Sequence, residues 1–307
     1  MRQPIRVLAP VLLAAGLLGT APLGAAPLGT APLGTALLVA APLGAASLGG
    51  AGSSPPEALS PDRLARVVDR YNAWAASIST LTGGGEAVLG APGEKDRTFR
   101  FSLVLSRPGH VRLQGRWGNL TTLFDLAATP EGWTLLLPRE RKVVRSPDGD
   151  AGAGLLLSPR DIFACAMPEP VSLEDLRGRG AHAAGGDAVR LVVPPAPGSA
   201  ELHRVLSVDP SSGIIQRLEV RRESLLEEPL LVAVYTDFED AGPAAFPRSI
   251  TVTTPERGWA RFTFDSAALN ESVDPRRFRI LVPRGATTVR AEDVDPGFLP
   301  EAPGGGE

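Results

Sequence analysis

The feature that most constrains this chain is a single change in the spacing of its apolar residues, from a helical period to a strand period. Ser60 is a favourable N-cap and Pro61 suits the first helical position, so a helix is predicted to begin there. The glycines at 83–85 predict its end. Apolar residues recur on one face of this helix, at Leu64, Val67, Val68, Tyr71, Ala75 and Ile78. A helix with one apolar stripe needs a sheet to pack against.

From residue 97 onward, apolar and polar residues alternate in short runs separated by turn sequences, which is typical of β-strands. About eleven strands are predicted, at 97–105, 111–117, 121–128, 133–137, 141–145, 188–193, 202–208, 214–222, 229–238, 248–254 and 259–264. Short connections require antiparallel pairing. The predicted fold is α+β and mainly β. It is a strongly curved antiparallel sheet, a half-open barrel, whose concave face is covered by the N-terminal helix and a short helical insertion within 146–186.

The first residues predict export. Arg2 and Arg6 precede an uncharged apolar run from Val7 to Leu18. This is the arrangement of a signal peptide whose h-region lies within residues 1–20. Residues 21–56 are an Ala/Pro/Leu/Gly repeat and linker, interpreted as a lengthened signal region or, alternatively, as a tether to the inner membrane. A single β domain is predicted over 57–295 and a disordered tail over 296–307. We therefore expect a periplasmic or cell-envelope protein.

The residues that usually carry chemistry are few. The single cysteine, Cys165, excludes an intramolecular disulfide and a multi-thiolate metal site, and it lies too far downstream for lipidation at an N-terminal cysteine. His110, His182 and His203 show neither HExxH nor another metal-ligand spacing, and there is no GxSxG elbow. His110 and Arg112 could be polar site residues, although a solvent-facing strand surface is favoured. With a net charge of −3 and no basic stripe, no nucleic-acid partner, catalytic residue, metal or cofactor is expected.

Several phrases, taken in order, resemble the LolA/LolB-like superfamily of periplasmic lipoprotein carriers. They are the leading helix that ends at 78–81, Arg107-Pro108 followed by Arg112, a hairpin with Trp133 and Pro138, Val-Asp-Pro-Ser-Ser-Gly-Ile at 208–214, Phe246-Pro247, and the closing Asp-Pro-x-x-Phe…Pro-x-Gly at 274–285. No single phrase is specific, and the order of all of them carries the resemblance. The match covers about residues 59–290.

The resemblance implies an apolar cavity that accepts acyl chains and is closed by helices acting as a lid. Arg107 matches the arginine of the family's Arg-Pro pair, which helps to hold the lid. The expected lid residues are Arg107, Leu155, Leu156, Ile162 and Phe163. The expected cavity residues are Phe99, Phe101, Leu103, Val111, Leu113, Trp117, Phe124, Trp133 and Leu135. From sequence alone, an ordinary filled core is the favoured interpretation of these side chains, and the resemblance shifts the expectation to a cavity.

The resulting hypothesis is a non-catalytic, monomeric periplasmic carrier that holds the acyl chains of a lipid or lipoprotein. An inner-membrane release complex and an outer-membrane acceptor are the protein partners that the resemblance implies. The alternative is an envelope sensor or protein-interaction module without a transport role. LolA-like domains also occur in proteins that bind regulators of the envelope stress response, where a second domain usually accompanies them.

Overall fold

A computed structural model of the 307-residue chain describes residues 59–118, 121–146, 157–176, 182–183, 188–195, 202–222, 228–242, 244–255 and 257–290. The predicted signal segment, the repeat and the tail lie outside the described residues, as do the predicted lid residues Leu155 and Leu156. The described residues form a mainly β structure with few helices. No helix among them combines the length and apolar character needed to cross a membrane.

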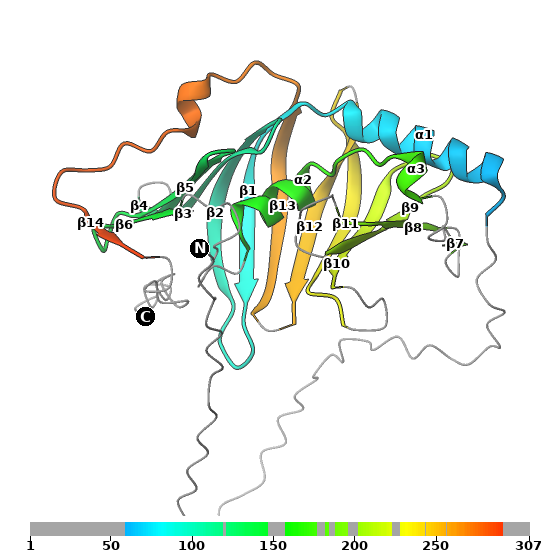
Figure 1. The fold of residues 1–307 in the computed structure, drawn as a ribbon. Helices are drawn as coiled ribbons and strands as arrows, with labels where there is room; N and C mark the ends of the chain where they lie inside the picture. Colours follow the sequence, from blue (N-terminus) through cyan, green and yellow to red (C-terminus); the bar gives the residue numbers. More distant parts are fainter. Residues whose placement is uncertain are drawn as a thin grey trace, which may run out of the picture. The chain divides into compact units, whose positions relative to one another are not determined.

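One open sheet runs through this part of the chain, in the order β14-β6-β5-β4-β3-β2-β1-β13-β12-β11-β10-β9-β8-β7 (Figure 1). Its strands are β1 (Thr80–Gly90), β2 (Arg97–Ser106), β3 (His110–Trp117), β4 (Thr121–Thr129), β5 (Gly132–Leu137), β6 (Lys142–Ser146), β7 (His182–Ala183), β8 (Val189–Val193), β9 (His203–Val208), β10 (Ile215–Arg221), β11 (Leu231–Asp240), β12 (Ala245–Thr254), β13 (Gly258–Leu269) and β14 (Thr287–Val289). Every neighbouring pair is antiparallel except β14 and β6, which are parallel. The prediction of a large antiparallel sheet is confirmed, and its eleven strands correspond to β2–β6 and β8–β13.

The helices are short apart from the first. They are α1 (Pro61–Ala76), α2 (Pro159–Ala166), α3 (Leu173–Leu176) and the 3-10 turn η1 (Pro275–Phe278). In α1, the Ser60 hydroxyl accepts a hydrogen bond from the Arg63 amide at 3.4 Å, as an N-cap should. In α2, Ser158 and Asp161 form a reciprocal capping box. The start of α1 is therefore where the sequence predicts it.

The glycine run at 83–85 does not end α1, and that prediction was wrong. The helix ends at Ala76, and the glycines lie inside β1, which pairs with both β2 and β13. A Cβ atom on Gly85 would lie 1.9 Å from the Thr263 carbonyl oxygen, and one on Gly83 would lie 2.9 Å from that of Ser266. Only glycine permits such an approach between strands, here next to a bulge between Gly84 and Gly85.

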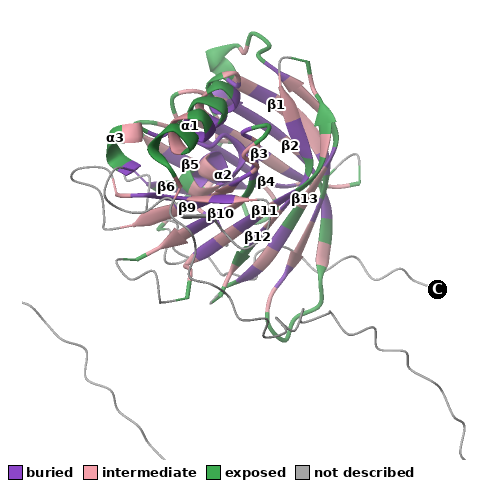
Figure 2. Cartoon of the chain, turned by 90° about the vertical axis from the view of Figure 1, so that its right-hand side faces the viewer, coloured by how far each residue is buried: buried purple, intermediate pink, exposed green. Residues whose placement is uncertain are grey.

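The sheet bends around α2. This helix contacts β3, β4 and β12, although β2, β1 and β13 separate β3 from β12 in the strand order. Figure 2 shows α2 inside the curve, with buried residues on the strands that face it. The inner face of the sheet, meaning the face toward α2, therefore carries the main apolar core.

The outer face of β3 and β4 is crossed by residues 270–290, called the strap below (Figure 1, orange to red). The strap contains η1 and ends in β14 beside β6. Its start is tied to the α1–β1 connection, because the Asn270 side chain accepts from the Ser79 amide at 2.8 Å and donates to the Ser77 carbonyl at 2.7 Å. A second, smaller apolar layer lies on this side, outside the main core: Val104, Ala127, Leu136, Val143 and Phe278.

Candidate functional site: the α2 region of the inner face

Arg107 joins the end of α1 to the chain that follows α2. It comes directly after β2, and its guanidinium donates to the carbonyls of Ile78 at 3.0 Å, Ala75 at 3.2 Å and Pro168 at 2.9 Å. It also lies over the Phe163 ring, 6.0 Å from the centroid. Burial lowers the pKa of Arg107, and the negative charge nearby on Glu169 opposes that shift. The charged group thus gathers carbonyl oxygens from two helical regions.

Side chains of α1 hold the same segment after α2. The Tyr71 hydroxyl donates to the Glu169 carbonyl at 2.8 Å, and burial raises the pKa of Tyr71. The Asn72 amide pairs with the backbone of Val171 in both directions, each hydrogen bond being 2.8 Å long. Trp74 Nε1 donates to the Ala245 carbonyl at the start of β12 at 2.9 Å. Residues 167–171 are therefore fastened to α1, whereas α2 itself contacts the sheet through apolar side chains.

The nine predicted cavity residues share the inner face. Register places Phe99, Phe101 and Leu103 on β2 opposite small residues of β1, and Leu113 of β3 opposite Leu103. Eight of the nine are buried in the main core, and Trp117 is partly buried against it. The lid candidates Ile162 and Phe163 are buried on α2. These placements bring the predicted residues together, and their role in binding a ligand stays a prediction.

An aromatic cluster that the sequence analysis missed completes this face. Phe101 contacts Phe262 and Phe264 edge-on, with ring centroids 5.4 and 5.1 Å apart, and Phe246 contacts Phe264 at 5.4 Å. A Cβ atom on Gly83 would lie 3.0 Å from the Phe264 ring, so the glycines of β1 make room for it. The alternation along 258–269 could have indicated Phe262 and Phe264, once pairing of β13 with β1 was known.

A small apolar cavity lies between α2 and the sheet. Its volume is about 20 Å³, enough for about one water molecule and far below that of an acyl chain. Cys165 lines it and is buried, which raises the pKa of its thiol. The lining residues are Leu103, Leu113, Leu157, Ile162, Cys165, Ala166, Ile250, Val252, Phe262 and Phe264. The described residues around this cavity therefore leave no space for an acyl chain.

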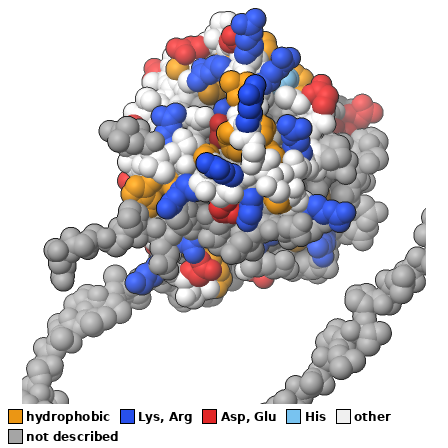
Figure 3. Space-filling view, turned by 90° about the vertical axis from the view of Figure 1, so that its left-hand side faces the viewer, with side chains coloured by type: hydrophobic (Ala, Val, Ile, Leu, Met, Phe, Trp, Pro, Cys, Tyr) orange, Lys and Arg blue, Asp and Glu red, His pale blue; other side chains and the backbone are white. Residues whose placement is uncertain are grey.

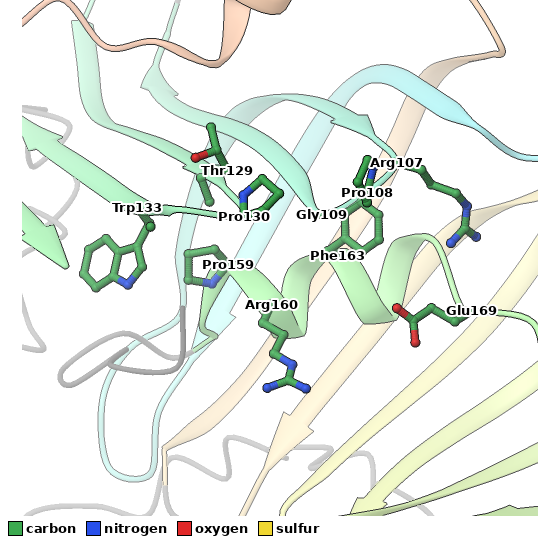
Figure 4. Close-up of a pocket in the computed structure, with 12 residues that line it drawn as sticks. Arg107, Pro108, Gly109, Thr129, Pro130, Trp133, Pro159, Arg160, Phe163 and Glu169 are labelled. Carbon is green, nitrogen blue, oxygen red and sulfur yellow. The ribbon is translucent and has the colours of Figure 1, made fainter. Parts of the chain in front are cut away.

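A larger pocket of about 480 Å³ opens at the other side of α2 and is called the mouth pocket (Figure 4). Phe163 and Pro159 of α2 face the turns that precede β3 and β5, with Arg107 and Glu169 at one end and Trp133 at the other. The indole Nε1 of Trp133 is buried and has no hydrogen-bond partner among the described residues. The full lining is Arg107, Pro108, Gly109, Ala128, Thr129, Pro130, Gly132, Trp133, Pro159, Arg160, Phe163 and Glu169.

The pair His110 and Arg112 lies on the opposite, outer face, and its interpretation as solvent-facing strand surface was wrong for Arg112. That guanidinium forms an ion pair with Asp125 and donates to the carbonyls of Arg277 and Arg279 at 2.9 and 2.7 Å. Its side chain is only 16 % exposed because the strap covers it. The His110 ring packs on Phe278 with centroids 5.1 Å apart. Within the described residues, no group of His, Cys, Asp and Glu is arranged to hold a metal ion.

Comparison with known proteins identifies solved structures of similar fold but no relative by sequence. No protein-family model matches the sequence, and no curated protein matches it. A DUF1329 family protein from Desulfovibrio piger has 14 % identity and a TM-score of 0.50, over 71 % of this chain and 95 % of that one. A LolA superfamily protein from Nitrosomonas europaea has 10 % identity and a TM-score of 0.48, over 69 % and 96 % of the two chains.

A putative outer membrane lipoprotein-sorting protein domain from Vibrio parahaemolyticus matches with 11 % identity and a TM-score of 0.45, over 71 % of this chain and 97 % of that domain. The likeness to the Desulfovibrio piger protein shows a shared fold. The resemblance predicted from the sequence is confirmed at the level of the fold. At these identities the likeness extends to the fold alone, so function must be argued from the residues of this chain.

Proposed function

We propose that this protein is a non-catalytic carrier of the cell envelope that holds acyl chains of a lipid or lipoprotein between α2 and the inner face of the sheet. The observation that carries the proposal is the position of α2 between two hollows. Phe163 lines the mouth pocket, while the neighbouring Ile162 lines the apolar cavity. A small outward movement of this one helix would join the two spaces into a single apolar groove.

The free energies involved favour replacing the contacts of α2 with those of an acyl chain. Exposing two large side chains of α2, Ile162 and Phe163, costs about 3–6 kcal/mol, whereas burying roughly ten methylenes of an acyl chain contributes about 8 kcal/mol. The ligand can therefore replace the helix as the cover of Leu103, Leu113 and the phenylalanine cluster. No catalytic group is needed for this binding, and none of the described side chains forms a recognisable catalytic set.

The lid proposed here is α2, and the segment that follows it is its hinge. Arg107 and the α1 side chains Tyr71 and Asn72 hold residues 167–171, so the hinge lies at that end and the start of α2 swings. In the mouth pocket, the unpartnered indole N–H of Trp133 would donate to an ester or amide oxygen of the bound lipid.

Export to the periplasm remains part of the proposal. It is supported by the predicted signal peptide and by the LolA-like fold. An acyl-chain donor at the inner membrane and an acceptor at the outer membrane are the partners that such a carrier would need. The protein is proposed to act as a monomer.

The proposal is tested by filling the cavity. Ala166 lines it, so Ala166→Leu adds volume where an acyl chain would lie. The full chain isolated from cell envelopes should carry co-purified acyl lipid in native mass spectrometry, and Ala166→Leu should lose most of it. Ala73→Leu, on the exposed side of α1, is the matched control and should keep it. An empty wild-type protein, or equal occupancy in both variants, would contradict the proposal.

A further inference from the structure

The most exposed large apolar side chain among the described residues is Leu281, which is 91 % accessible. It lies in the strap between η1 and β14, in the sequence Arg276-Arg-Phe-Arg-Ile-Leu-Val-Pro-Arg284. A lone exposed leucine needs no explanation in general. Here, however, the four arginines of this stretch are exposed as well, and none of them forms an ion pair with another described residue.

The tip is presented by a fixed support. Phe278 is buried, and Arg112 donates to the carbonyls of Arg277 and Arg279 on one side of Leu281. On the other side, the Thr287 amide donates to the Arg141 carbonyl at 2.8 Å and β14 pairs with β6. Leu281 is thus held outward between two anchored ends. The transfer of an apolar side chain from water into an apolar phase lowers the free energy, and this support holds Leu281 in water.

The stretch that carries the tip has charge of one sign. No acidic residue occurs between Arg276 and Arg290, and Asp274, just before this stretch, caps η1 by accepting a hydrogen bond from the Arg276 amide. The exposed Arg145 of the neighbouring β6 and the exposed Arg141 just before that strand add to the same side. Figure 3 shows Lys and Arg side chains gathered on the face that carries the strap, with hydrophobic side chains between them. The chain as a whole has a net charge of −3, so this stretch departs from the average charge of the chain.

We propose that the strap is a membrane-docking element, in which Leu281 enters the surface of an anionic phospholipid bilayer while Arg276, Arg277, Arg279 and Arg284 bind its phosphate groups. A single apolar residue or a few charges alone bind membranes weakly, and the combination of the two gives useful, reversible attachment. Guanidinium groups pair with phosphate oxygens through two parallel hydrogen bonds. Docking brings the protein to a lipid surface and leaves the α2 region, on the other face of the sheet, free.

The first test places a reporter at the tip. Leu281→Cys in the full chain can be labelled with an environment-sensitive dye, because the natural Cys165 is buried and reacts slowly. We expect a blue-shifted, brighter emission with vesicles of phosphatidylglycerol and phosphatidylethanolamine, and no change with phosphatidylcholine vesicles. The same dye on Ala73→Cys, at the exposed side of α1, should not respond. A dye at 281 that stays in water while the protein sediments with the vesicles would overturn the proposal.

The second test removes charge at the tip. Arg279→Gln combined with Arg284→Gln should lower the vesicle partition coefficient about 25-fold, since each basic residue near an anionic surface is equivalent to roughly a fivefold change. Arg63→Gln combined with Arg66→Gln removes the same charge from the exposed side of α1 and should have little effect. If the partition coefficient falls equally in the two double variants, the attraction is nonspecific and the proposal is overturned. The proposal is also overturned if the protein binds a soluble acidic protein and does not bind the vesicles.

These measurements are independent of acyl-chain binding. A protein whose interior stays closed would still dock through the strap, and the cavity-filling Ala166→Leu should leave the dye response at residue 281 unchanged. Failure of the docking tests therefore leaves the carrier proposal standing, and failure of the lipid analysis leaves docking standing.

Discussion

Two arginines that lie five positions apart in the sequence fasten opposite faces of the sheet, and they do so differently. Arg107 holds residues 167–171 and the end of α1 on the inner face through backbone carbonyls alone. Arg112 holds the strap on the outer face through carbonyls as well, but it is also paired with the buried carboxylate of Asp125. When a guanidinium leaves carbonyl groups, no carboxylate loses its counter-ion. When it leaves a buried carboxylate, that charge stays buried and unpaired, so the outer attachment is fixed and the inner one can act as a hinge.

Breaking the outer attachment should have the largest effect on stability. Arg112→Leu leaves Asp125 buried without its cation and frees the strap, so the free energy of unfolding should fall by about 3–5 kcal/mol. Urea denaturation of the purified protein measures this. Arg112→Leu combined with Asp125→Leu removes both charges and should recover a large part of the loss. A loss below about 1 kcal/mol for the single variant would mean that the pair is not fixed as described.

Breaking the inner attachment should affect movement more than stability. Arg107→Gln removes charge-assisted hydrogen bonds at a half-buried site, and the free energy of unfolding should fall by about 1–3 kcal/mol. The natural Cys165 reports on α2, because its thiol is shielded while α2 is closed. Arg107→Gln should shift the equilibrium between closed and open α2 toward the open state by about 1.4 kcal/mol or more. The rate at which a thiol reagent labels Cys165 should then rise at least tenfold.

Arg204→Gln is the control for that experiment. Arg204 contacts the same segment by a partly exposed ion pair with the Glu169 side chain at 3.1 Å. Its loss should change the free energy of unfolding by under about 1 kcal/mol and leave the labelling rate near that of the wild type. Equal labelling rates for the two variants would remove the distinction drawn for Arg107.

The smallest expected effect is at the tip of the strap. Leu281→Ser changes a side chain that is 91 % exposed, so the free energy of unfolding should stay within about 0.5 kcal/mol of the wild-type value. Thermal and urea unfolding would check this. A marked destabilisation would show that Leu281 supports the outer attachment and that its exposure has no functional meaning.

Most of the sheet could be predicted because its strands alternate and its turns are short, as in β2 to β6. The prediction missed β1, where the glycines at 83–85 have the composition of a helix stop, and two strands too short to show alternation, β7 with two residues and β14 with three. At β1 and β14 the strand is specified by its neighbours: Thr263 leaves no space for a side chain at Gly85, and β6 offers an edge to β14.

The candidate site shows the same limit. Inward residues such as Leu103 and Phe101 followed from alternation within one strand. That Phe262 lies against Phe101 depends on the pairing of β1 with β13, which no local pattern indicates. The role of Arg112 was missed for a similar reason, since its carbonyl partners at 277 and 279 come from the far end of the domain.

The central position of β1 in the sheet also sets the order in which the parts of this protein can fold. The strands β1 to β6 follow one another as neighbours in the sheet, and so do β7 to β13, so each half can assemble from local hairpins. Within the sheet, β1 against β13 unites the two halves, with Leu81 meeting Leu269, and β14 then adds to the edge at β6. Contacts so distant in sequence form late and slowly. A chain still being synthesised or threaded through a membrane would therefore hold two unfinished half-sheets, which join only when the last long strand arrives.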